Sequence, residues 1–120
     1  MPNPAGSYSG SFFNAGGTRE GEISATLHPP DPVHPTSFTG QVVVIIGETR
    51  HTFELKGTIN SAGRFIAIAQ ATAGHLIFDA TFLPVPDDGM PAMITGRHIL
   101  ELNDGTVHEG TFSMTAETFR

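Results

Sequence analysis

The chain has 120 residues, no cysteine and a formal net charge of −6 at pH 7. This length supports one domain with one core, and the lack of cysteine excludes disulfides, thiolate metal sites and thiol nucleophiles. The acidic balance and the scattered lysines and arginines argue against nucleic-acid binding, because phosphates would be repelled. No apolar run approaches the roughly 20 residues that span a bilayer. Since no leader peptide is recognisable either, we expect a soluble, cytoplasmic protein without membrane contact.

Apolar residues recur at every second position along most of the chain, which is typical of strands rather than helices. We therefore predict an all-β fold in which residues 1–120 form a single domain, an eight-stranded antiparallel up-and-down barrel. The predicted strands run from Gly6 to Phe13, Thr18 to Leu27, Ser37 to Ile46, His51 to Asn60, Arg64 to Ala71, His75 to Leu83, Ala92 to Leu102, and Thr106 to Ala116.

Repeated glycines between polar residues favour a closed barrel over an open sheet. Each has the same parity as the apolar residues of its strand, so it lies on the inner face. A glycine there removes a Cβ where a sheet must bend sharply. These positions are Gly10, Gly21, Gly40, Gly57, Gly96 and Gly110.

The short connections fit hairpin turns. Residues 61–63 and 103–105 each fit a three-residue turn that ends in a left-handed glycine, and residues 14–17 and 47–50 fit four-residue loops. With a three-residue turn at 103–105, Leu100 faces His108 and His98 faces Gly110 on the inner face. A two-residue turn there would cross the two faces of the sheet, which a barrel does not tolerate.

Two longer connections are rich in proline, from His28 to Pro35 and from Pro84 to Pro91. In a meander both fall at the same end of the barrel as the chain termini. One interpretation is that they surround a mouth, since functional residues often lie on loops held by a rigid scaffold. The other is that the prolines only stiffen two connections. Within the second connection, Asp87, Asp88 and Gly89 are typical of a plain turn.

Three polar side chains have inward parity, namely Tyr8, His98 and His108. Buried without partners, each would cost roughly 1–3 kcal/mol, so they must bond to one another, to water or to a ligand. A structural hydrogen-bonded trio, a cluster that orients a ligand and an acid–base pair all remain open.

A metal site is not expected. The inner set offers no inward carboxylate, which makes two histidines and a tyrosine a poor ligand set. At the rim, His28, Asp31 and His34 are separated by prolines that keep the chain extended. Neither group gives a convincing site, and no other cofactor motif is present.

The outward positions differ between strands. Strands two and four present polar residues such as Glu20, Glu22 and Glu54, whereas strands five and six present Ile66, Ile68 and Ile77. An exposed apolar patch usually marks an interaction surface. We therefore predict a homo-oligomer that assembles through the outer face of strands five and six. The competing interpretation is a sandwich that buries these residues within one chain.

The opening segment Gly6-Ser7-Tyr8-Ser9-Gly10-Ser11-Phe12 resembles the Gly-x-Trp first strand of lipocalin-like and avidin-like (calycin) barrels, with Tyr8 in place of tryptophan. The resemblance implies a ligand-binding barrel, and the avidin type often associates through outer barrel faces. The chain has no tryptophan, so no biotin-binding residue is carried over. The hairpin from Leu102 to Gly110 is also similar to late hairpins of allene-oxide-cyclase-like barrels.

Three functions follow as hypotheses. The first is a barrel that binds a small, mainly apolar molecule through the end with the proline-rich loops. In it Tyr8, His98 and His108 orient the ligand, and the apolar walls are Phe12, Phe53, Phe78 and Phe112. The second is a cyclase or isomerase that folds a flexible substrate into a reactive conformation. The third is a filled barrel that acts through its outer surface as an inhibitor, effector or assembly subunit.

Overall fold

The computed structural model describes residues 3–84 and 91–117, and the predicted turn at Asp87, Asp88 and Gly89 lies outside these residues. The described chain forms eight strands and no helix, and each strand lies within two residues of its predicted bounds. The strands are β1 (Gly6–Asn14), β2 (Arg19–Leu27), β3 (Ser37–Ile46), β4 (Thr49–Ile59), β5 (Arg64–Ala71), β6 (Gly74–Leu83), β7 (Met93–Leu102) and β8 (Val107–Ala116).

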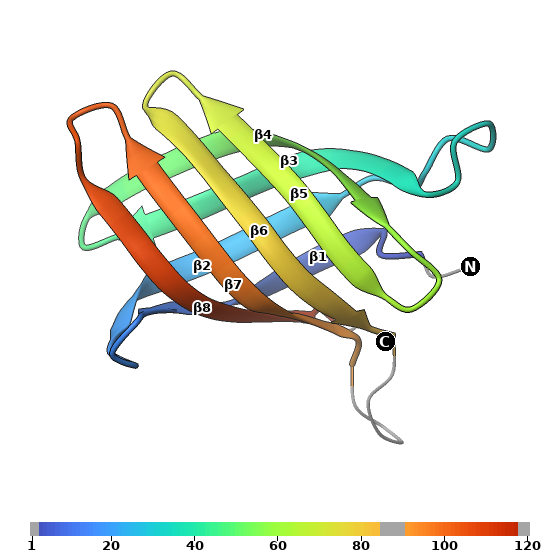
Figure 1. The fold of residues 1–120 in the computed structure, drawn as a ribbon, viewed down its shortest axis with the longest axis horizontal. Coiled ribbons are helices and arrows are strands. Elements are labelled where there is room, and N and C mark those ends of the chain that lie inside the picture. The colour runs from blue at the N-terminus through green and yellow to red at the C-terminus, as the bar shows by residue number, and fades with distance from the viewer. Residues whose placement is uncertain (1–2, 85–90, 118–120) are drawn as a thin grey trace.

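The strands form a closed antiparallel barrel in meander order, as the sequence predicts (Figure 1). β1 pairs with β2 on one side and with β8 on the other, with Tyr8 opposite Ala116 and Asn14 opposite Gly110 in the closing pair. Closure excludes the alternative of a two-sheet sandwich. In the described part of the chain no helix is long and apolar enough to cross a membrane.

The inner face is a packed apolar core. Side chains of the predicted inward parity are almost completely buried, and those of the opposite parity are mostly exposed. Aromatic side chains contact one another inside the barrel, with ring centroids 4.8 Å apart for Phe38 and Phe65 and 4.9 Å apart for Phe78 and Phe112. The largest fully buried side chains include Phe12, Phe53, Phe65, Phe78 and Phe112.

Glycine permits the close approach of neighbouring strands that this small barrel requires. A Cβ built on Gly110 would lie 1.9 Å from the carbonyl oxygen of Phe13, and one on Gly10 would lie 1.8 Å from that of Ser113. The other four glycines of the repeated pattern would likewise place a Cβ within 3 Å of the backbone of a neighbouring strand. Since real Cβ atoms do not approach so closely, each position requires glycine.

Three tight turns, β1–β2, β4–β5 and β7–β8, share one geometry. Residues 15–17, 61–63 and 103–105 are three-residue loops whose last residue is a glycine with φ of 90°, 87° and 92°. Two predicted loop lengths are wrong. The first loop has three residues rather than four, because Asn14 N donates to Thr18 O. The loop between β3 and β4 has two residues, Gly47 and Glu48, because Ile46 pairs with Thr49 and Gly47 supplies a φ of 62°.

The two ends of the barrel differ in the way the sequence predicts. The turns β1–β2, β3–β4, β5–β6 and β7–β8 lie at one end, which we call the tight-turn end (Figure 1). The 28–36 connection and the amino terminus lie at the other end, which we call the long-loop end. The long-loop end is filled by aromatic residues, since Tyr8, Phe38, Phe65 and Phe82 are at most 4% exposed.

Candidate functional site

The four phenylalanines predicted as ligand walls lie in the core. Phe12, Phe53, Phe78 and Phe112 are at most 2% exposed and belong to one cluster of buried side chains. Their faces are occupied by other side chains of this chain, and the hollows along the described residues lie on the outer faces of the strands.

Tyr8 is separated from the two histidines. Its hydroxyl donates a 2.8 Å hydrogen bond to the carbonyl oxygen of Pro4, and burial raises its pKa to about 12. Its neighbour on β8 is Ala116, eight residues along the strand from His108. At roughly 3.3 Å per residue, this places Tyr8 about 26 Å from His108 along the strand direction. The structure therefore does not bring Tyr8 together with the histidines, and Tyr8 anchors the start of the chain at the long-loop end.

His98 lies on the inner face of the barrel, as the sequence predicts. It pairs with Gly110 across β7 and β8, and its ring contacts Phe12 edge to face with centroids 5.2 Å apart. The residue is 3% exposed, and neither ring nitrogen has a hydrogen-bond partner among the described residues. Burial lowers the pKa of this imidazole and outweighs the opposing effects of the Glu20 charge and of the backbone at Thr111.

His108 bonds to an inward carboxylate that the sequence analysis missed. Its Nδ1 lies 3.2 Å from Oε2 of Glu20, and both side chains are about four-fifths buried. The expectation that Glu20 points into solvent is wrong because the β1–β2 ladder shifts between Phe12 and Phe13. Phe13 pairs with Arg19 and Phe12 with Gly21, so Glu20 is the extra residue of a bulge and turns inward. A bulge in this position is invisible to a period-two analysis of the sequence.

His98, His108 and Glu20 form a polar cluster near the tight-turn end, on the opposite side of the core from Tyr8. Oε1 of Glu20 has no hydrogen-bond partner among the described residues, as is also true of both nitrogens of His98. His108 lies two residues along β8 from Gly110, the partner of His98, and its hydrogen bond to Glu20 brings the three groups together. No three His, Cys, Asp or Glu residues in the described ranges are arranged to hold a metal ion.

The predicted rim histidines form no cluster. His28, Asp31 and His34 are exposed. Asp31 accepts a hydrogen bond from Val33 N through its side chain and from His34 N through its carbonyl, so it stabilises a tight turn. The hydrogen bonds of Asp31 therefore shape the connection between β2 and β3.

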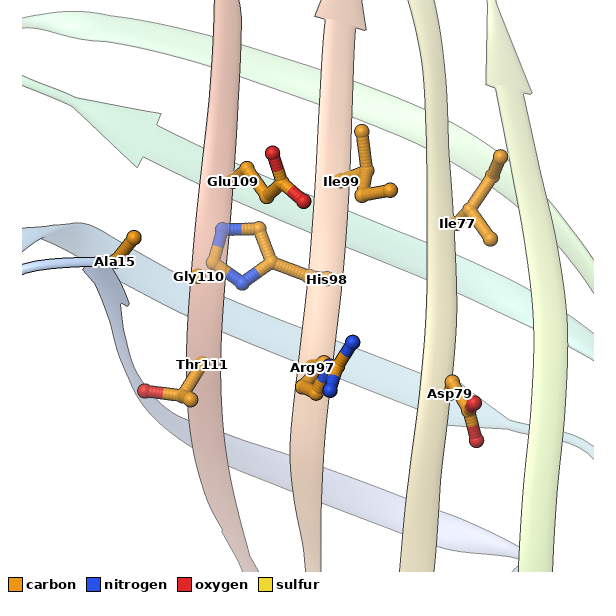
Figure 2. A pocket seen from close by; sticks show the side chains of 9 residues that line it. All are labelled: Ala15, Ile77, Asp79, Arg97, His98, Ile99, Glu109, Gly110 and Thr111. Atoms are coloured by element: carbon orange, nitrogen blue, oxygen red, sulfur yellow. The ribbon is translucent and has the colours of Figure 1, made fainter.

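A hollow of about 470 Å³ lies on the outer face of β6, β7 and β8, and we call it the outer hollow (Figure 2). Ile77 and Ile99 provide apolar contact area, and Arg97 and Glu109 provide opposite charges. His98 and Gly110, which pair across β7 and β8, also border it, although both ring nitrogens of His98 are shielded from solvent. Arg97, Ile99 and Glu109 carry no sequence signal of a site, since each is an ordinary outward residue of its strand.

The outer apolar residues predicted on strands five and six are exposed as expected. Ile66, Ile68 and Ile77 are 43%, 42% and 38% exposed. Ile68 pairs with Ile77, and Ile77 pairs with Ile99, so three isoleucines form a row across β5, β6 and β7. We call the outer face of β5 and β6 that contains Ile66, Ile68 and Ile77 the isoleucine face.

Comparisons with known proteins leave the family open: no protein-family model matches the sequence, and no curated protein is significantly similar to it.

Proposed function

We propose that this protein is an assembly subunit, a filled barrel that acts through its outer surface and binds a second copy through the isoleucine face. The observation that carries the proposal is the row of exposed isoleucines on a barrel whose interior is already packed. Inward apolar residues have intramolecular partners, whereas Ile66, Ile68 and Ile77 have a large fraction of their surface in water. Exposed apolar patches of this kind are typical of interaction surfaces.

The charge of the isoleucine face favours a second copy as the partner. The chain carries a net charge of −6, so most contacts between two copies would be repulsive. On the isoleucine face, however, the Arg64 guanidinium pairs with the Asp79 carboxylate at 2.9 Å, which leaves this region close to neutral. Two copies can therefore approach here without bringing unpaired acidic groups together.

The pattern around the isoleucines is also compatible with two-fold symmetry. Along β6, Asp79 lies two residues to one side of Ile77 and His75 lies two residues to the other side. A two-fold axis along the line from Ile68 to Ile77 would bring the Arg64–Asp79 pair of one copy towards the pair that His75 forms with Glu101 in the other, and the converse. Such self-complementarity is what an isologous dimer interface requires.

The packed interior supports this proposal over a ligand held inside the barrel. A small apolar molecule that entered from the long-loop end would have to displace Phe38, Phe65 and Phe82, which already fill that end. A cyclase or isomerase acting inside the barrel would need the same space. The cytoplasmic location expected from the sequence, like the calycin resemblance, stays a prediction.

The experiment compares two lysine variants by sedimentation velocity. Ile68→Lys places a charge at the centre of the isoleucine face, and Val107→Lys places one at an exposed valine of β8, away from that face. The proposal predicts that the unmodified chain and Val107→Lys sediment as dimers and that Ile68→Lys sediments as a folded monomer. A monomeric unmodified chain, or a dimer that survives Ile68→Lys, would contradict it.

A further inference from the structure

Opposite charges flank the row of isoleucines on strand β7. The row continues from Ile77 on β6 to Ile99 on β7, which pair with each other. Arg97 lies two residues along β7 on one side of the row, and Glu101 lies two residues along it on the other side. At roughly 3.3 Å per residue, each is about 7 Å from the row. One strand therefore presents a cation and an anion at equal distances from a line of apolar side chains.

Arg97 is accessible to a group from outside its own chain. It is exposed on the outer face of β7, and within residues 3–84 and 91–117 it forms no ion pair. Its neighbour across β6 and β7 is Asp79, whose carboxylate is engaged by Arg64 through hydrogen bonds of 3.2 and 2.9 Å. Arg97 also borders the outer hollow, so there is room beside its guanidinium for an incoming side chain (Figure 2).

Glu101 can receive a cation without losing its present neighbour. Its Oε1 lies 2.5 Å from Nε2 of His75 on β6, and the Glu101 side chain is 47% exposed. An ionised carboxylate has two oxygens that accept hydrogen bonds, and it suits the planar guanidinium of arginine. The second oxygen of Glu101 is thus suited to an arginine that approaches from solvent.

A two-fold axis along the isoleucine row would bring these two charges together between copies. Such an axis places each residue on one side of the row against the residue equally far on the other side of the same strand. On β7, Arg97 then faces Glu101 of the partner subunit, and the same pair recurs by symmetry. An axis along β6 would instead bring Asp79 against its own copy, which is repulsive. The charges therefore favour the axis along the row.

The curvature of the barrel limits such a contact to β5, β6 and β7. Lys56 on β4 and Glu109 on β8 extend the row at its two ends. The wall of an eight-stranded barrel turns through about 90° over two strands, so these two residues face away from a partner centred on β6. Arg97 and Glu101 are only one strand from β6, at the rim of the contact. Charges at a rim determine the orientation and the choice of partner more than the affinity.

We propose that Arg97 of each copy pairs with Glu101 of the partner subunit, and that these two ion pairs fix the orientation in which the isoleucine faces meet. This pairing rests on the proposed assembly and adds the basis of its specificity. The isoleucines supply the apolar contact area. The ion pairs reject a surface that lacks the complementary charges, because like charges would be brought together at two places.

Two charge reversals and their mixture provide the test. Arg97→Glu brings two carboxylates together at each pair, and Glu101→Arg brings two guanidinium groups together. Each variant alone should therefore raise the Kd of the dimer about 100-fold or more. In an equimolar mixture, both pairs of a heterodimer again join opposite charges. Native mass spectrometry should then show the heterodimer as the main dimeric species, which also demonstrates that both variants are folded.

The matched controls are Arg19→Glu and Glu22→Arg, which change the net charge equally at exposed positions of β2, four strands from β6 around the barrel. Each should dimerise like the unmodified chain. The pairing is contradicted if either reversal on β7 leaves the Kd unchanged, or if the mixture stays monomeric. A dimer that is lost in Ile68→Lys but retained in Arg97→Glu would contradict this pairing alone, whereas a monomeric unmodified chain would contradict the proposed assembly as well.

Discussion

His98 and Gly110 face each other across β7 and β8 on the inner face of the barrel. The same glycine lets β1 approach β8, because a Cβ there would lie 1.9 Å from the carbonyl oxygen of Phe13. Gly110 thus permits the closure of the barrel directly beside its buried histidine.

Substitution of Gly110 should therefore lower the stability of the protein far more than the addition of one methyl group normally does. We expect Gly110→Ala to lower the free energy of unfolding by about 2 kcal/mol or more, since the methyl group meets backbone atoms that cannot move independently. Gly16→Ala is the matched control, because its Cβ would meet nothing closer than 3.4 Å. Urea denaturation measures both. Equal stability of the two variants would show that the strands can separate at Gly110 without penalty.

The stability of the protein should fall as the pH drops below 6.5. Burial lowers the pKa of His98 in the folded state, whereas the unfolded chain has an ordinary histidine that gains its proton near pH 6.5. Between these two pKa values the unfolded state binds more protons, so acidification favours unfolding, and above pH 6.5 this contribution vanishes. In His98→Gln the loss of stability between pH 7 and 5 should be smaller than in the unmodified protein. His28→Gln, which changes an exposed histidine, should leave this loss of stability unchanged.

The hydrogen bond between Glu20 and His108 should contribute measurably to the stability of the protein, because both side chains are largely buried. We expect Glu20→Gln and His108→Gln to be coupled in a double-mutant cycle by about 1 kcal/mol at pH 7. Denaturation of the two single variants and the double variant gives the coupling. A coupling near zero would mean that the bulge positions Glu20 without any contribution from the bond.

Tyr8 should act as a structural anchor. Tyr8→Phe removes the donor to Pro4 O and leaves that carbonyl buried, which should cost about 1–2 kcal/mol of stability. Thermal denaturation measures this cost, and a Tyr8→Phe variant as stable as the unmodified protein would argue against this assignment.

The strand order, the inner face and the glycine positions are predictable from the sequence, because alternation and parity are local properties. The face assignment of His98 opposite Gly110 follows from one turn length that the sequence encodes in Asn103, Asp104 and Gly105. The fold could thus be predicted almost completely.

The composition of the polar cluster could not be predicted from the sequence, for identifiable reasons. One extra residue between Arg19 and Gly21 turns Glu20 inward, and no local pattern marks that bulge. The distance between Tyr8 and His108 depends on the register of β1 against β8, which forms only when the barrel closes.

The mass of the unmodified chain in solution tests the central claim most directly. Sedimentation equilibrium over a wide range of protein concentrations should give twice the 12.7 kDa of one chain, with dissociation on dilution. A mass of 12.7 kDa at every concentration would contradict assembly through the isoleucine face.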